Sequence, residues 1–134
     1  MTVLLVDAAN VVGARPDGWW RDRAGATARL LGRLAAARPR LTAPDGRTIT
    51  EVVVVVEGRA REAAVPEGVR VVVAEGSGDD ALAACAQELT DAGTPLVVVT
   101  ADRGLRARLP AGVPVLSPGR LLAQLDEADG SRAT

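Results

Sequence analysis

Four aspartates stand at positions where a divalent cation or a phosphate can be bound. Asp7 directly follows the apolar run 3–6, Asp79 and Asp80 begin a segment with helical periodicity, and Asp102 follows another apolar run. Hard divalent cations such as Mg²⁺ prefer oxygen ligands and usually take one or two carboxylates, several waters and substrate phosphate. Carboxylates held near one another repel strongly unless a cation lies between them. These acids therefore predict a divalent metal site for the hydrolysis of a phosphate ester.

The residue types that are missing narrow the chemistry further. The 134 residues include no His, Lys, Tyr or Phe, so all 16 basic residues are arginines. Without Lys there is no P-loop lysine and no Schiff base, and without His there is no Ser-His-Asp or Cys-His nucleophile. The single Cys85 leaves no ordinary zinc site. Carboxylate chemistry is what remains.

The overall composition is that of a globular domain. Hydrophobic residues make up 48% of the chain and charged residues 25%. No apolar run approaches the roughly 18 to 20 residues of a membrane helix. The N-terminus lacks the basic region of a signal peptide, and a lone cysteine cannot form an internal disulfide. We therefore expect a cytoplasmic protein. The net charge of −1 leaves nucleic-acid binding open, since local patches decide it.

Apolar runs that alternate with helical periodicity predict the elements that must position the acids. Continuous runs of Val and Leu are typical of inner strands of a parallel sheet, which are buried on both faces. Residues 11–20, with two glycines and a proline, are expected to form a loop, and residues 59–64 a short helix or a turn. The expected strands are 3–6, 49–56, 69–74, 96–99 and 113–116, and the expected helices are 22–37, 79–91, 103–109 and one that begins at Pro118 with Ser117 as its N-cap.

This alternation predicts a three-layer α/β/α fold, doubly wound around about five parallel strands. Right-handed crossovers place the carboxyl ends of all strands on one edge, where open α/β sheets bind their ligands. We expect one domain over residues 1–127 and a flexible tail over residues 128–134. The carboxylates expected at this edge are Asp7, Glu57, Glu75 and Asp102, with the helix start at Asp79 and Asp80 beside them.

The segments around the acids resemble the three signature motifs of the NYN domain, a branch of the PIN-like nuclease superfamily. They are Leu5–Val12, Gly78–Leu82 and Val98–Arg103, which stand in the family's order and span nearly the whole chain. The small single-domain bacterial members, some of them ribosome-associated mRNA endonucleases, are the relatives that this resemblance suggests. It implies a PIN-like sheet of order 3-2-1-4-5 and Mg²⁺- or Mn²⁺-dependent hydrolysis of RNA, with RNA as the partner and ribosome association left open.

The resemblance also assigns roles to single residues. Asp7, Asp79 and Asp102 match the metal-binding acids, and Asp80 matches an accessory catalytic acid. Asn10 matches the motif asparagine, which supports the loop or touches substrate. The residues expected to contact RNA are Asn10, Thr100, Arg103 and Arg106.

Each acid also has a purely structural interpretation. Asp79 and Asp80 can cap and stabilise the N-terminus of their helix. Ser77 stands at capping-box spacing from Asp80, and acidic side chains interact favourably with the helix dipole at this end. Asp102 can cap the short helix that follows it. Asp7 is different, because an acid directly after a buried strand has no evident local structural purpose. The joint occurrence of the acids favours a functional site.

Two further points stay open at this stage. Trp19 and Trp20 either stack on unpaired bases or pack their loop onto the core. The function itself has two alternatives to a ribonuclease that cuts single-stranded RNA internally. One is a nucleotide phosphohydrolase that uses the same metal site, and the other is a catalytically silent RNA- or ribosome-binding module.

Overall fold

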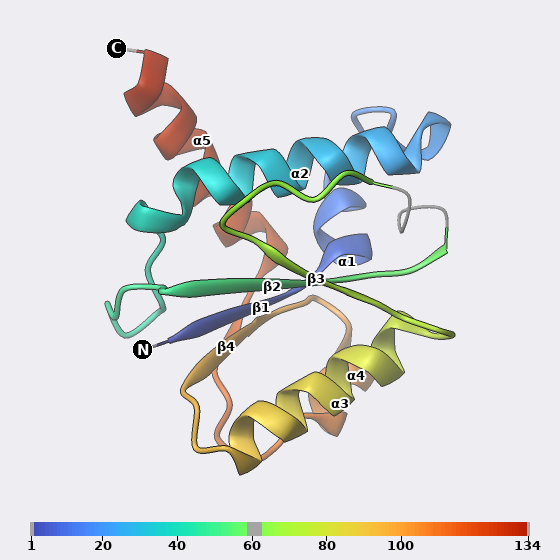
Figure 1. Cartoon of the computed structure of the whole chain (residues 1–134), viewed down its shortest axis with the longest axis vertical. Coiled ribbons are helices and arrows are strands. Elements are labelled where there is room, and N and C mark those ends of the chain that lie inside the picture. Colours follow the sequence, from blue (N-terminus) through green and yellow to red (C-terminus); the bar gives the residue numbers. More distant parts are fainter. Residues whose placement is uncertain (1, 59–62, 134) are drawn as a thin grey trace.

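The computed structural model describes residues 2–58 and 63–133, and they form an all-parallel sheet with helices on both faces (Figure 1). The sheet has five strands in the order β3-β2-β1-β4-β5, which confirms the order implied by the resemblance. The strands are β1 (Val3–Asp7), β2 (Glu51–Val56), β3 (Arg70–Val73), β4 (Leu96–Val99) and β5 (Val115–Leu116).

Helices cover both faces of the sheet, so the predicted three-layer α/β/α fold is confirmed. The short helix α1 and the long helices α2 and α5 lie on one face, and α3 and α4 lie on the other (Figure 1). The helices are α1 (Ala8–Val12), α2 (Arg23–Ala37), α3 (Gly78–Asp91), α4 (Arg103–Arg108) and α5 (Pro118–Ala133), with 3₁₀ turns η1 (Trp19–Arg21) and η2 (Arg38–Arg40).

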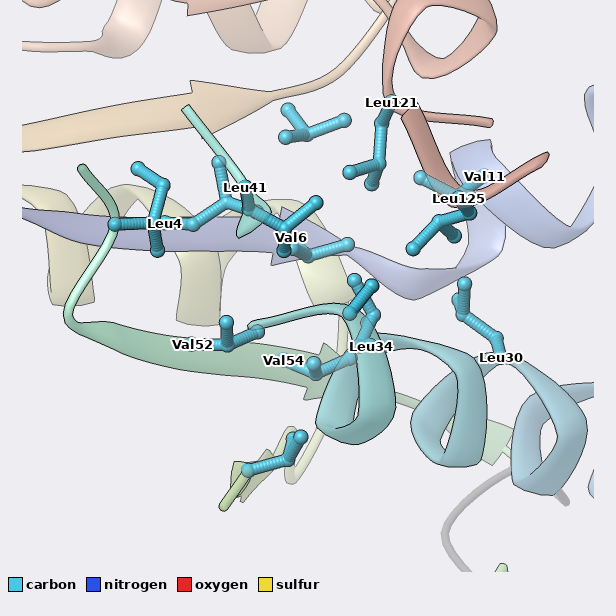
Figure 2. Packing of buried hydrophobic residues seen from close by; sticks show 14 of the residues in the cluster. Leu4, Val6, Val11, Leu30, Leu34, Leu41, Val52, Val54, Leu121 and Leu125 are labelled. Carbon is cyan, nitrogen blue, oxygen red and sulfur yellow. The ribbon is translucent and has the colours of Figure 1, made fainter. Parts of the chain in front are cut away.

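Strand β2 shows why the valine run folds as an inner strand. Its side chains alternate between the two faces, so Val52 and Val54 join the core beneath α2 and α5 while Val53 and Val55 join the core beneath α3. All of them are buried. Figure 2 shows the first of these cores, where Leu30 and Leu34 of α2 pack with leucines of α5 over the sheet. Two covered faces explain why the sequence has no polar alternation here.

Most helix ends follow the expected capping chemistry. The Asp22 carboxylate accepts from the Gly25 amide at 2.9 Å at the start of α2, and the Ser117 hydroxyl accepts from the Arg120 amide at 3.2 Å at the start of α5. Gly93 follows α3 with φ +74°, a conformation that side-chain-bearing residues rarely adopt. These end points agree with the predicted helices.

The prediction of a loop over residues 11–20 was wrong in part, because α1 extends to Val12 and η1 begins at Trp19. The short helix forms because Asp7 caps it and because Val11, only 2% exposed, joins the core.

The end of the chain also differs from the prediction. The segment 128–133 is helical where the sequence predicted a frayed tail. There Ala128 is buried, and Asp129 accepts from Arg33 of α2 at 2.9 Å. Of the predicted helix or turn over 59–64, residues 59–62 lie outside the described residues. No helix among the described residues combines the length and the apolar character needed to cross a membrane.

Candidate functional site

Asp7 ends β1 at the carboxyl edge of the sheet, between β2 and β4. Asp7 is 7% exposed, and its carboxylate accepts a hydrogen bond from the Asn10 side-chain amide at 2.8 Å and one from the Thr100 hydroxyl at 3.3 Å. The Asn10 backbone amide lies 3.4 Å from the other carboxylate oxygen, which makes Asp7 the N-cap of α1. The prediction that Asp7 lacks a local structural purpose was therefore wrong.

Asn10 and Thr100 connect Asp7 to the loop after β4. The Asn10 side-chain oxygen accepts from the Ala101 amide at 3.0 Å, and the Thr100 hydroxyl accepts from the Asp102 amide at 3.1 Å. Since Thr100 is 1% exposed and bonds to both sides, it has a positioning role here. Its predicted contact with RNA, like that of Asn10, stays a prediction.

Asp102 caps α4 while it stands at the same edge. One of its carboxylate oxygens accepts from the Leu105 amide at 3.0 Å, as the structural interpretation of this residue predicted. The cap engages that oxygen, and Asp102 is half-buried at the end of β4. Capping and ligand binding are therefore compatible at this residue.

Glu57 joins the acids through the start of α3. It follows β2 as Asp7 follows β1, and its carboxylate accepts from the Gly78 amide, the first residue of α3. The Ser77 hydroxyl accepts from the Asp79 amide at 3.1 Å and supplies the cap that the sequence predicted. These contacts hold the N-terminus of α3, and with it Asp79, beside the ends of β1 and β2.

The pKa of Asp7 responds to its burial and to the charges of two other acids. Burial raises the pKa of Asp7 first, and the hydrogen bonds from Asn10 and Thr100 lower it in part. The negative charges of Asp79 and Glu57 raise it further. Asp7 is therefore within the electrostatic reach of two acids from other segments.

The pKa of Asp79 responds in the same way to its burial and to its charged neighbours. Burial raises its pKa most, and the charges of Asp102 and Glu57 raise it further, while Arg108 lowers it. Asp80, the next residue, points to solvent and pairs with Arg108 of α4 at 2.8 Å. Asp7, Glu57, Asp79 and Asp102 thus converge from four segments, while Asp80 lies at the rim.

The convergence stops short of a preformed cage for a cation. Among residues 2–58 and 63–133, no three acidic or cysteine side chains are close enough to hold one ion together. The donor set still fits Mg²⁺ or Mn²⁺, because these ions take one or two carboxylates and fill the other positions with water and phosphate. The metal-binding roles of Asp7, Asp79 and Asp102 stay predictions.

The predicted arginines lie beside the acids. Arg103 and Arg106 are exposed on α4, the helix that Asp102 caps. Their forked guanidinium groups are suited to bidentate contacts with phosphate. Contact with RNA stays a prediction for both.

No family model matches the chain, and no curated protein does. The chain is similar in fold to Rae1 (YacP) of Bacillus subtilis. One Rae1 crystal structure matches with a TM-score of 0.75 and 20% identity over 99% of this chain and 78% of Rae1. A second, of a point mutant, matches with a TM-score of 0.73 and 23% identity over 98% of this chain and 79% of that one.

The similarity to Rae1 establishes the fold of the chain. At 20% and 23% identity, the similarity supports the parallel sheet and the position of its carboxyl edge. It does not assign a role to any single residue.

Sequence reasoning placed Glu57 at this edge but did not include it among the site residues. The signal was present, since Glu57 directly follows an apolar strand as Asp7 does. Its partner Gly78 lies 21 residues away, so the contact with α3 could only be seen in the folded chain. Glu75, which was also expected at this edge, is exposed after β3 and is absent from the charges that shift Asp7 and Asp79.

Proposed function

We propose that this protein is a metal-dependent endoribonuclease that cuts single-stranded RNA. The observation that supports the proposal is the convergence of Asp7, Glu57, Asp79 and Asp102 at the carboxyl edge of the sheet. There the charges of Asp79 and Glu57 raise the pKa of Asp7, and the charges of Asp102 and Glu57 raise the pKa of Asp79. An uncompensated group of carboxylates costs stability, and a divalent cation bound to a phosphate would compensate it. The choice of RNA rests on the resemblance of the motifs to NYN domains.

Asp7, Asp79 and Asp102 are the residues that would hold Mg²⁺ or Mn²⁺. When bound, such a cation lowers the pKa of water and stabilises negative charge on a phosphate. Asn10 and Thr100 hold the Asp7 carboxylate in one orientation, so this one ligand is oriented before a cation binds.

In this proposal, arginines of α4 bind the substrate. Arg103 and Arg106 bind the phosphates that flank the cleaved bond, and they keep the RNA backbone against the acids. Asp80, which pairs with Arg108 at the rim of the site, would serve as an accessory acid. No step in this scheme needs a histidine or a lysine.

The test uses a circular single-stranded RNA, which an exonuclease cannot degrade. Wild-type protein with Mg²⁺ or Mn²⁺ should linearise the circle, and a chelator should stop the reaction. Asp7→Asn and Asp102→Asn should each slow cleavage by at least about 100-fold, the lower range for the loss of a catalytic group.

Asp91→Asn is the matched control. Asp91 is an exposed aspartate at the C-terminal end of α3, away from the carboxyl edge, so its substitution should leave the rate unchanged. Cleavage that survives in both Asp7→Asn and Asp102→Asn would reject the proposal. Nucleoside triphosphates offered in parallel distinguish a phosphohydrolase, and RNA binding without turnover under either metal would indicate a silent module.

A further inference from the structure

A small cavity opens next to Asp7 on the side of α1 and α2. Its volume is about 120 Å³. Ala8, the residue after Asp7, lies in its wall, and Glu57 belongs both to this wall and to the acidic group. The cavity therefore shares Glu57 with the group of acids. Its lining residues are Ala8, Ala9, Val12, Trp19, Arg23, Thr27 and Glu57.

Trp19 forms an aromatic wall of this cavity, and its ring is held by several neighbours. The Arg23 guanidinium carbon lies 5.4 Å from the ring centroid, and the Trp20 ring meets it edge-on at a centroid distance of 5.9 Å. Gly13 follows α1 close to the ring, since an added Cβ atom there would lie 3.8 Å from the Trp19 ring. The orientation of the ring is thus set before any ligand binds.

The two tryptophans differ in a way that points to a role for Trp19. Trp20 is 53% exposed and does not line the cavity, whereas Trp19 is half-buried and does. Packing the loop onto the core would account for a buried ring. It does not by itself account for a half-buried ring that lines a cavity shared with Glu57.

The chemistry of the wall matches a nucleobase. Unpaired bases stack on aromatic rings and on guanidinium planes, which Trp19 and Arg23 supply. The N–H groups on a base edge can donate to the Glu57 carboxylate, and Ala8 and Val12 provide apolar contact. The cavity is well below the roughly 300 to 1,000 Å³ of pockets that enclose whole small-molecule ligands. It suits one ring system whose sugar and phosphate stay outside.

We propose that this cavity is a nucleobase subsite, which holds one unpaired base of the RNA on Trp19 while an adjacent phosphate lies at Asp7. The assignment deepens the proposed function and rests on it for the identity of the polymer. It agrees with the single-stranded substrate proposed above, because a base must leave its stack to enter the cavity.

Intrinsic fluorescence provides a direct test, because Trp19 and Trp20 are the only tryptophans and the chain has no tyrosine. Trp20→Ala leaves Trp19 as the sole fluorophore, and Trp19→Ala leaves Trp20. Each variant is titrated with a single-stranded RNA hexamer in the presence of a chelator, so that binding is measured without cleavage. A hexamer of the same backbone without bases is the matched ligand.

The RNA hexamer should quench Trp19 in the Trp20→Ala variant, and the baseless hexamer should not. Trp19→Ala should bind the RNA hexamer about 5- to 150-fold more weakly than Trp20→Ala, as expected for the loss of one stacked base. Equal quenching by both hexamers, or unchanged affinity of Trp19→Ala, would overturn the subsite. Trp20 is exposed, so the decisive Trp20→Ala protein should fold normally, which circular dichroism checks.

The two proposals fail in different ways. Loss of circular-RNA cleavage in Asp7→Asn, together with unquenched Trp19, keeps the nuclease and rejects the subsite. Base-dependent quenching of Trp19 in a protein that cleaves no RNA with either metal keeps the subsite and rejects the nuclease.

Discussion

Thr100 is the residue through which the acid of β1 and the acid after β4 are held together. Its hydroxyl donates to the Asp7 carboxylate and accepts from the Asp102 amide, and it is 1% exposed. A buried group that loses its partner costs roughly 1 to 3 kcal/mol. The stability of the fold and the geometry of the site are therefore coupled at one hydroxyl group.

Replacing this hydroxyl tests the coupling. Thr100→Val should lower the free energy of unfolding by about 1 to 3 kcal/mol, because Asp7 and the Asp102 amide both lose a partner. Thr100→Ser keeps the hydroxyl and should retain most of that stability. Urea denaturation of the three proteins measures the difference, and a Thr100→Val protein as stable as Thr100→Ser would show that the hydroxyl carries no such role.

Asp7 itself is expected to destabilise the fold in the absence of metal. Its pKa is raised by burial and by the charges of Asp79 and Glu57, so the ionised carboxylate is less stable in the folded chain than in the unfolded chain. At neutral pH in chelator, Asp7→Asn should therefore unfold at a temperature equal to or above that of the wild type.

The amide oxygen of the new side chain can still accept from Asn10, so the local structure should survive. Thermal unfolding followed by circular dichroism provides the measurement, with Asp91→Asn as the control for removal of an exposed charge. A lower unfolding temperature for Asp7→Asn alone would mean that the hydrogen bonds of Asp7 outweigh its burial.

At the scale of elements, short helices carry the acids of the site. Asp7 caps α1 and Asp102 caps α4, and each cap uses one oxygen of the carboxylate. Capping fixes the side chain relative to the strand end, because the helix and the strand meet at that residue. The structural and the functional interpretations of these acids are therefore compatible.

Ion pairs connect helix α5 to α2 and to the segment after α1. Asp126 accepts from Arg15, after α1, and from Arg33 of α2, both at 2.7 Å, and these arginines hold the pKa of Asp126 at about 2. The folded-state pKa lies below the ordinary value of 3.8, so the ionised carboxylate stabilises the fold. That contribution is present above about pH 4 and is lost as the pH falls toward 2.

Asp126→Asn should therefore reduce stability at neutral pH and flatten the loss of stability below pH 4. Urea denaturation at several pH values measures both effects. Glu127→Gln, at the exposed next position of α5, is the matched control and should follow the wild type. Since these side chains are partly exposed, high salt should shrink the difference between Asp126→Asn and wild type, and a difference that salt does not change would contradict an ionic origin.

At the scale of the whole molecule, the net charge of −1 provides no long-range electrostatic attraction for RNA. The proposed RNA substrate would therefore have to be held by local contacts. Each phosphate that an arginine neutralises contributes about 0.7 to the slope of log affinity against log salt for a single strand.

Arg103→Gln and Arg106→Gln should each weaken RNA binding and reduce this slope by about 0.7. Arg47→Gln is the control, because Arg47 lies in the connector before β2, at the opposite edge of the sheet, and pairs with Asp45 at 3.2 Å. Fluorescence anisotropy at several salt concentrations, in chelator, gives the slopes. Unchanged slopes in both variants would remove α4 from the RNA interface.

The strands, the long helices and several caps could be predicted from the sequence because they depend on neighbouring residues. The valine run of β2 and the caps of Ser77, Asp102 and Ser117 each report local backbone and burial preferences. Helix α1 was missed because its propensity is weak and its formation depends on Asp7 and on burial of Val11. Local patterns do not contain that burial.

By itself the sequence determined the alternation of strands and helices, and that alternation placed the acids at one edge of a parallel sheet. Only the tertiary structure decided which groups meet there. The bond from Thr100 to Asp7 spans 93 residues and the pair of Arg15 and Asp126 spans 111, and no local preference encodes such distances. Periodicity reports which side of an element is buried, whereas contacts between elements depend on how the buried sides pack against one another.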